Sequence, residues 1–198
     1  MTKVAAGITT SLDGYIAGPN DGPGKGLGVG GERLHYWVFG GPWSYAEEPT
    51  GDATGPDKEF LDAGIARVGA VVGGRNTYDA AEAWGGHNPF GAPFFIVTHR
   101  VEDAPDGGGF TFVNGVDEAV AQARDAAGGK DVFIMGGADV IRQGLRGGHV
   151  EELSISIAPV VLGEGKRLFD DFDETVSLEH VRLLQSPFAT HITYRVVR

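Results

Sequence analysis

Three segments of the sequence have residue types suited to binding a phosphate. They are residues 71–78, Val-Val-Gly-Gly-Arg-Asn-Thr-Tyr, residues 132–141 and residues 94–100. In the first two, a pair of glycines lets the backbone approach an anion closely, and the helix expected to follow supplies unpaired N–H donors. An ordinary Gly-Gly turn with a solvated arginine would explain the first segment equally well.

The third segment favours one form of nicotinamide cofactor. Its expected strand ends in Thr98, His99 and Arg100, which carry a hydroxyl, an imidazole and a guanidinium. An NAD site usually offers an acidic residue to the ribose hydroxyls, whereas a 2′-phosphate is bound by arginine with hydroxyl support. These residues therefore favour NADPH. The Rossmann fingerprint does not apply, because residues 132–141 lack its third glycine.

The elements expected around these segments alternate as in βαβ units. Apolar runs bounded by glycine, proline and aspartate alternate with segments of helical period. We expect strands over residues 4–10, 68–73, 93–98, 110–113, 131–135, 152–161, 178–185 and 191–197, and helices over residues 56–67, 116–127 and 138–146. No helix separates the last three strands. The sequence therefore predicts an α/β fold with a mixed, mostly parallel sheet flanked by helices and antiparallel strands at its C-terminal end.

Composition and charge exclude several classes of protein. The 198 residues, 41% of them hydrophobic, are enough to bury a core as one domain over residues 1–198. A formal net charge of -11 argues against binding to nucleic acid or to an anionic membrane. There is no cysteine, and the six histidines lack ligand spacing, so no metal site is predicted. No secretory signal or membrane-spanning stretch is recognisable, so we expect a cytoplasmic protein.

A long segment over residues 18–55 is rich in glycine and proline and also carries Trp37, Phe39, Trp43 and Tyr45. Long loops inside compact domains are usually functional or disordered. The aromatic side chains favour a lid over a binding site. The alternative is a surface loop that packs on its own aromatic residues.

Five motifs occur in an order that resembles a known superfamily. They are Thr9–Ala17, Gly74–Tyr78, Thr98–Arg100, Gly136–Ala138 and the segment Glu152–Phe169. Together they resemble the dihydrofolate reductase-like superfamily, and specifically the stand-alone relatives of the reductase domain of the bifunctional riboflavin-biosynthesis deaminase-reductase. The zinc deaminase half of that enzyme is not expected here, because its site uses cysteine ligands.

The resemblance implies an NADPH-dependent reductase similar to 5-amino-6-(5-phosphoribosylamino)uracil reductase, which acts on a small heterocyclic or ribosyl substrate. Related proteins are commonly homodimers, so a homodimer is expected here. The resemblance places Thr9, Ile16 and Ala17 beside the nicotinamide, which passes a hydride directly to a bound C=N or C=O carbon. The implied phosphate-binding residues are Gly74, Arg75, Asn76 and Thr77; Thr98, His99 and Arg100 at the 2′-phosphate; and Gly136, Gly137, Ala138, Asp139 and Val140 at the pyrophosphate.

Two aspartates are candidate catalytic acids. In dihydrofolate reductases an acid near the start of the helix before the Gly-Arg strand contacts the substrate, and here that register falls near Asp57. Pro56 followed by acidic residues is also what an ordinary helix start predicts. Asp13 lies in a Ser-Leu-Asp-Gly sequence and is as readily explained as a turn-former.

A substrate phosphate would need its own cationic site. Lys166 and Arg167 could supply it, with Glu164 facing the same pocket, and the alternative is a polar turn between two strands. Folate reduction is disfavoured, because no arginine or lysine between Arg75 and Arg100 is present to bind the folate carboxylate. An NADP(H)-binding module of the same fold without reductase turnover is the other alternative.

Overall fold

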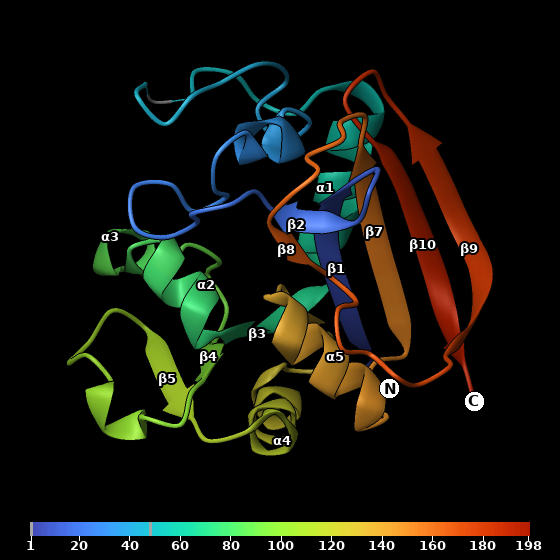
Figure 1. Cartoon of the computed structure of the whole chain (residues 1–198). Helices are drawn as coiled ribbons and strands as arrows, with labels where there is room; N and C mark the ends of the chain where they lie inside the picture. The colour runs from blue at the N-terminus through green and yellow to red at the C-terminus, as the bar shows by residue number, and fades with distance from the viewer. Residues whose placement is uncertain (1, 48) are drawn as a thin grey trace.

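The computed structural model describes residues 2–47 and 49–198, and a mixed β-sheet forms its centre (Figure 1). Eight of the described strands make up this sheet in the order β5-β4-β3-β6-β1-β7-β10-β9. All neighbouring pairs from β5 to β7 are parallel, whereas β10 is antiparallel to both β7 and β9. The predicted mixed sheet with antiparallel C-terminal strands is confirmed. Residue 48 of the long loop and residue 1 lie outside the described residues.

The elements follow one another closely along the chain. The strands are β1 (Val4–Ser11), β2 (Tyr15–Ala17), β3 (Val68–Gly74), β4 (Phe94–Val97), β5 (Phe110–Val113), β6 (Asp131–Ile134), β7 (Glu152–Ala158), β8 (Lys166–Arg167), β9 (Ser177–Gln185) and β10 (Thr190–Val197). The α-helices are α1 (Gly55–Arg67), α2 (Arg75–Ala80), α3 (Ala83–Gly86), α4 (Val116–Ala126) and α5 (Ala138–Arg146), and short 3-10 helices cover Gly31–His35 and Val101–Asp103.

Two sequence predictions about strands need correction. The strand predicted over residues 152–161 ends at Ala158, because Pro159 has no N–H to donate to a neighbouring strand. The polar turn that is the alternative to a cation site at residues 166 and 167 is not formed, because these residues make up β8, which pairs with β2 outside the main sheet. Strands of two and three residues are too short to show alternation in a sequence.

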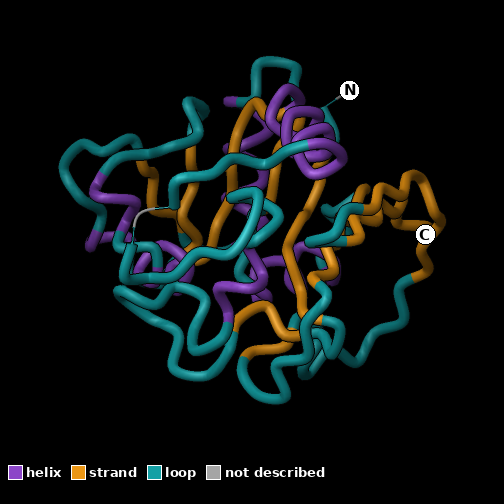
Figure 2. The backbone as a smooth tube through the Cα atoms, turned by 90° about the horizontal axis from the view of Figure 1, so that it is seen from above, coloured by secondary structure: helices purple, strands orange, loops and turns teal. Residues whose placement is uncertain are grey.

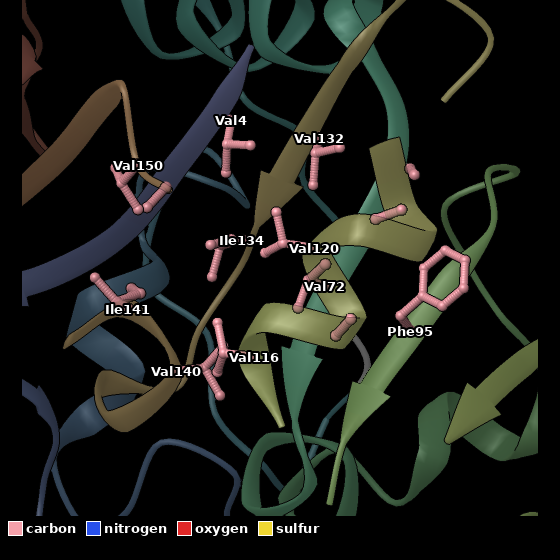
Figure 3. Close-up of a cluster of buried hydrophobic side chains, with 14 of the residues drawn as sticks. Val4, Val72, Phe95, Val116, Val120, Val132, Ile134, Val140, Ile141 and Val150 are labelled. Atoms are coloured by element: carbon pink, nitrogen blue, oxygen red, sulfur yellow. The ribbon is translucent and has the colours of Figure 1, made fainter. Parts of the chain in front are cut away.

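One face of the sheet carries the main apolar core. Val4 and Ala6 on β1 are fully buried there, because alternate residues of a strand point to the same face. Helix α4 supplies Val116, Ala119, Val120 and Ala123, which follow the i, i+3, i+4, i+7 spacing of a helix with one apolar side. In Figure 3, Val120 of α4 and Ile141 of α5 lie with the strand residues of this cluster. This face therefore anchors the two helices.

The opposite face is covered less completely. At the β3–β5 edge it holds a smaller aromatic cluster that includes Phe94, Phe110 and Phe112. Helix α1 crosses the rest of this face, and in Figure 1 it lies behind the sheet while α5 lies in front. Ile65 on α1 is 61% exposed, so this helix packs loosely. None of the helices within residues 2–47 and 49–198 is long and apolar enough to cross a membrane.

The tight packing of α5 and the loose packing of α1 predict different losses of stability when isoleucine is replaced by alanine. Ile141 is fully buried, so Ile141→Ala should lower the free energy of unfolding by about 2–5 kcal/mol. Ile65→Ala on the exposed side of α1 is the matched control and should change it by less than about 0.5 kcal/mol. Urea denaturation of the two variants measures both values. Equal losses would contradict the assignment of the core to the α4 and α5 face.

Candidate cofactor and substrate cleft

A cleft with a volume of about 1670 Å³ opens where β1, β3, β4 and β6 end and continues beneath α1. Seen from above in Figure 2, loops spread over this end of the sheet. Open α/β sheets bind ligands at the carboxyl ends of their strands. We refer to this space, with the lining residues named below, as the cleft.

The cleft brings together all three predicted phosphate-binding segments. Its lining includes Gly74, Arg75, Asn76, Thr77, Thr98, His99, Arg100, Gly136, Gly137, Ala138, Asp139 and Val140, and also Thr9, Ile16 and Ala17. Lys166 and Arg167 line it as well, whereas Asp13, Asp57 and Glu164 do not. Segments that are far apart in the sequence therefore meet in one space.

The glycines at the ends of β3 and β6 are in close contact. The Gly74 N–H donates to the Gly136 carbonyl at 2.9 Å, and a Cβ at Gly74 would lie 3.0 Å from Val140 Cγ2. A Cβ at Gly137 would lie 3.2 Å from Thr77 Oγ1. Helix α5 begins directly after Gly137, and within residues 2–47 and 49–198 no side chain caps its first N–H groups. This arrangement fits a phosphate group, because the glycines leave the N–H donors accessible.

Two arginines at the end of the cleft share one counter-ion. Asp103 Oδ2 lies 3.1 Å from Arg75 Nη1 and 3.4 Å from Arg100 Nε, and Asp79 binds Arg75 Nε at 2.8 Å. Asp79, followed by Asp103, raises the pKa of Arg75 above its ordinary value. Thr98 Oγ1 accepts a hydrogen bond from the Arg100 N–H at 3.0 Å. Sequence reasoning missed Asp103, although its position three residues after Arg100 was a usable signal.

The long loop contributes aromatic residues to the same cleft. Trp37 Nε1 donates to Thr9 Oγ1 at 3.0 Å, which fixes the loop to β1. Trp43 lies between Phe39 and Tyr45, with ring centroids 5.2 and 5.1 Å apart. All four of these aromatic residues line the cleft. The loop thus packs on its own aromatic residues and also forms a wall of the cleft, and its role as a moving lid stays a prediction.

Asp57 belongs to a buried hydrogen-bonded chain beside the cleft. Its Oδ1 lies 2.8 Å from His191 Nε2, and His191 Nδ1 lies 2.8 Å from Ser156 Oγ. The three residues are 1–3% exposed, and Ser156 is the member that lines the cleft. Phe60 stacks on the imidazole with ring centroids 4.2 Å apart, and the Trp37 ring meets its edge at 4.8 Å. Asp57 is therefore paired with His191 rather than capping α1.

The electrostatics of this chain are set by burial and by the carboxylate. Burial lowers the pKa of His191 below its ordinary value of 6.5, and the Asp57 carboxylate opposes that shift in part. The imidazole is therefore neutral at neutral pH. Neither His191 nor Ser156 was identified from the sequence. A signal existed, because residues 154 and 156 on one strand and 191 and 193 on another are polar at every second position.

Asp13 is not part of the cleft lining. Asp13 accepts hydrogen bonds from Ser11 Oγ at 2.6 Å and from the N–H groups of Leu162 and Gly163 at 3.1 and 2.7 Å. The hydrogen bond from Ser11, followed by those from the two backbone groups, lowers the pKa of Asp13 to about 2. Its carboxylate thus stabilises a turn in its ionised form.

Both predicted substrate cations already have partners. Lys166 Nζ lies 2.6 Å from Asp21 Oδ2, and the Arg167 guanidinium lies over the Tyr15 ring, 4.6 Å from its centroid. Glu164 is exposed and lies outside the cleft lining. The three residues therefore do not converge on one anion site in this structure.

Comparisons with known proteins agree with this architecture. A candidate riboflavin biosynthesis protein from Shewanella sp. PV-4 has a similar structure, with a TM-score of 0.73 and 25% sequence identity over 100% of both chains. Dihydrofolate reductase from Enterococcus faecalis, solved with NADP(H), has a TM-score of 0.62 and 18% identity over 98% of this chain and 96% of that chain. The latter likeness concerns the fold.

Sequence comparisons assign the family. YyaP, an uncharacterized protein of Bacillus subtilis (strain 168), is 47% identical over 53 residues, which are 27% of this chain and 28% of that protein. The match thus spans less than a third of the Bacillus protein. The model of the RibD C-terminal domain family matches residues 2–190. The chain therefore belongs to the RibD C-terminal domain family and has the dihydrofolate reductase-like fold.

Proposed function

We propose that this protein is an NADPH-dependent reductase of a small heterocyclic or ribosyl substrate. This proposal rests on the meeting of all three predicted phosphate-binding segments in one cleft, next to the first turn of α5, which no side chain of the described residues caps. Family membership supports a reductase-type function. The likeness to a dihydrofolate reductase solved with NADP(H) supports a nicotinamide cofactor.

The residues of the cleft fit the parts of NADPH. The N–H groups after Gly137 would bind the pyrophosphate, and Arg75 and Arg100 would bind the 2′-phosphate. Thr9, Ile16 and Ala17 would orient the nicotinamide and exclude water from it. A bound NADPH supplies a hydride to the C=N or C=O carbon of the substrate. The protein must then supply a proton to the substrate atom that gains negative charge.

The chain of Asp57, His191 and Ser156 is suited to deliver this proton. When the imidazole is protonated, Nε2–H donates to the Asp57 carboxylate and Nδ1–H donates to Ser156 Oγ. The Ser156 hydroxyl passes its proton into the cleft and takes the Nδ1 proton in return, which leaves His191 neutral. In this scheme Asp57 stabilises the imidazolium, and the net result is the transfer of one proton from His191 to the substrate through Ser156.

Cofactor binding is the first expectation of the proposed function. We expect NADPH to bind with micromolar affinity and NADH roughly tenfold or more weakly, because the 2′-phosphate adds charge-assisted hydrogen bonds. Trp37 and Trp84 line the cleft, so quenching of intrinsic tryptophan fluorescence reports binding. If neither nucleotide binds, the proposed function is wrong.

Asp103 should weaken NADPH binding, because its carboxylate occupies the two guanidinium groups that the 2′-phosphate needs. Asp103→Asn should therefore increase the affinity for NADPH about three- to tenfold and leave the affinity for NADH unchanged. Asp106→Asn is the control, since Asp106 is exposed and forms no ion pair within the described residues. An equal gain of affinity for NADPH and NADH would argue against the proposed 2′-phosphate site.

Proton delivery should depend on pH in a defined direction. Because the pKa of His191 lies below 6.5, turnover should fall as the pH rises through that lowered value. Asp57→Asn removes the carboxylate that raises this pKa, so the profile should move to still lower pH and turnover at pH 7 should fall about tenfold. Substrates for this assay come from a panel of pyrimidine ribosides and pterins.

The matched control for this substitution is Asp62→Asn. Asp62 lies on the same helix, is 58% exposed and pairs with Lys58. The Asp62→Asn variant should keep both the pH profile of turnover and the affinity for NADPH unchanged. The ring ¹⁵N shifts of His191 provide a readout that needs no substrate, and they should change in Asp57→Asn only. An unaltered pH profile in Asp57→Asn would contradict the proton path.

A further inference from the structure

The sheet face beneath α1 is polar, although a sheet face covered by a helix is ordinarily apolar. The strand register places Ser156 beside both Thr9 and His191 in one row across the sheet. In the next row, Ser154 lies beside Gly7 and Thr193.

The side chains of these two rows belong to the part of the cleft that runs under α1. Ser154 Oγ and Thr193 Oγ1 lie 3.1 Å apart, and both residues line the cleft. Because each hydroxyl can donate and accept, the pair can exchange this mutual hydrogen bond for bonds to a ligand.

Helix α1 leaves space above this polar floor. A Cβ at Gly64, on the helix, would have no heavy atom of the described residues within 4 Å apart from its chain neighbours and the backbone of its own helix, and Gly64 lines the cleft. Across from it, Gly7 has no side chain, and a Cβ there would lie 2.9 Å from the Phe133 ring. We call this space, bounded by Gly64, Phe133, Ser154 and Thr193, the α1 groove. It is continuous with the cleft.

The far end of the α1 groove is unfavourable for an anion. Arg67 lies there between two carboxylates, at 2.8 Å from Asp131 Oδ2 and 2.7 Å from Glu152 Oε1. One cation and two carboxylates leave a formal charge of -1. At the side of the groove, Arg182 is paired with Glu59. A phosphate would therefore meet net negative charge in the α1 groove.

We propose that the α1 groove binds the uncharged, hydroxyl-bearing end of the substrate, such as an unphosphorylated ribosyl group. This inference rests on the proposed function, because it assigns the reacting heterocycle to the Thr9 end of the same cleft. The hydroxyls of Ser154 and Thr193 would bind the sugar hydroxyls. The charge at Arg67, Asp131 and Glu152 would select against a phosphate. Lys166 and Arg167, at the rim, are then not the anchor of the substrate tail.

A pair of probes that differ by one phosphate tests this inference on the full chain. Uridine and uridine 5′-monophosphate are titrated while backbone ¹H–¹⁵N signals are recorded. We expect uridine to shift the signals of Gly7, Gly64, Ser154 and Thr193, and the monophosphate to bind roughly tenfold more weakly. Absence of these shifts with uridine would overturn the inference. Tighter binding of the monophosphate, with shifts at Lys166 and Arg167, would overturn it too.

Two leucine substitutions on α1 separate filling of the groove from a general effect on the helix. Gly64→Leu places a side chain in the α1 groove and should lower the affinity for uridine about tenfold or more. Ala66→Leu is the matched control, because Ala66 is exposed and does not line the cleft. Leucine is much more favourable in a helix than glycine and only slightly less favourable than alanine, so folding should be retained in both variants. Equal effects of the two variants would contradict a site in the groove.

Removal of the hydroxyls tests the chemistry of the site. The double variant Ser154→Ala, Thr193→Val removes both hydroxyls with little change of shape and should weaken uridine about tenfold. NADP⁺ is titrated into each sample in a separate experiment, and its binding is followed by the backbone ¹H–¹⁵N signals of Thr77 and Gly137. If NADP⁺ binds and uridine does not, this inference alone is overturned. If uridine binds in the α1 groove and NADP⁺ does not bind, the proposed cofactor is overturned instead.

Discussion

The contact between the ends of β3 and β6 is the constraint on which the cleft depends. The Gly74 N–H bonds to the Gly136 carbonyl at 2.9 Å, so the two strand ends meet with no side chain between them. Any larger residue at position 74 would meet Val140 of α5. Because the strands meet this closely, the start of α5 and the side chain of Arg75 face the same space. The predicted phosphate-binding residues converge for this reason.

The two faces of the sheet divide stability and function between them. On one face, valine, isoleucine and alanine side chains pack against α4 and α5 and supply most of the buried apolar contact. On the other face, Ser154, Ser156, His191 and Thr193 are polar and α1 packs loosely over them. A polar face costs stability unless its groups are hydrogen-bonded. No buried side-chain nitrogen or oxygen of the described residues lacks a partner, which agrees with this requirement.

Sequence patterns predicted the sheet and the long helices, because each is encoded by residues adjacent in the chain. They also indicated the three segments that line the cleft, whose binding of phosphate stays a prediction. The pairing of Asp57 with His191 joins residues 134 positions apart, and no local pattern reports such a contact. The strands β2 and β8 were missed because two or three residues carry no periodicity. Asp103 was missed since the prediction considered the cations that bind a phosphate and not the acids that compete with it.

A crystal structure of the protein with NADP⁺ would show whether the cleft is the cofactor site. We expect the pyrophosphate at the N–H groups that follow Gly137, the 2′-phosphate between Arg75 and Arg100, and the nicotinamide against Thr9 and Ile16. The α1 groove would stay open beside the nicotinamide. A nucleotide bound outside the cleft, or with its nicotinamide far from Thr9 and Ser156, would contradict the assignment of this cleft as the site of reduction.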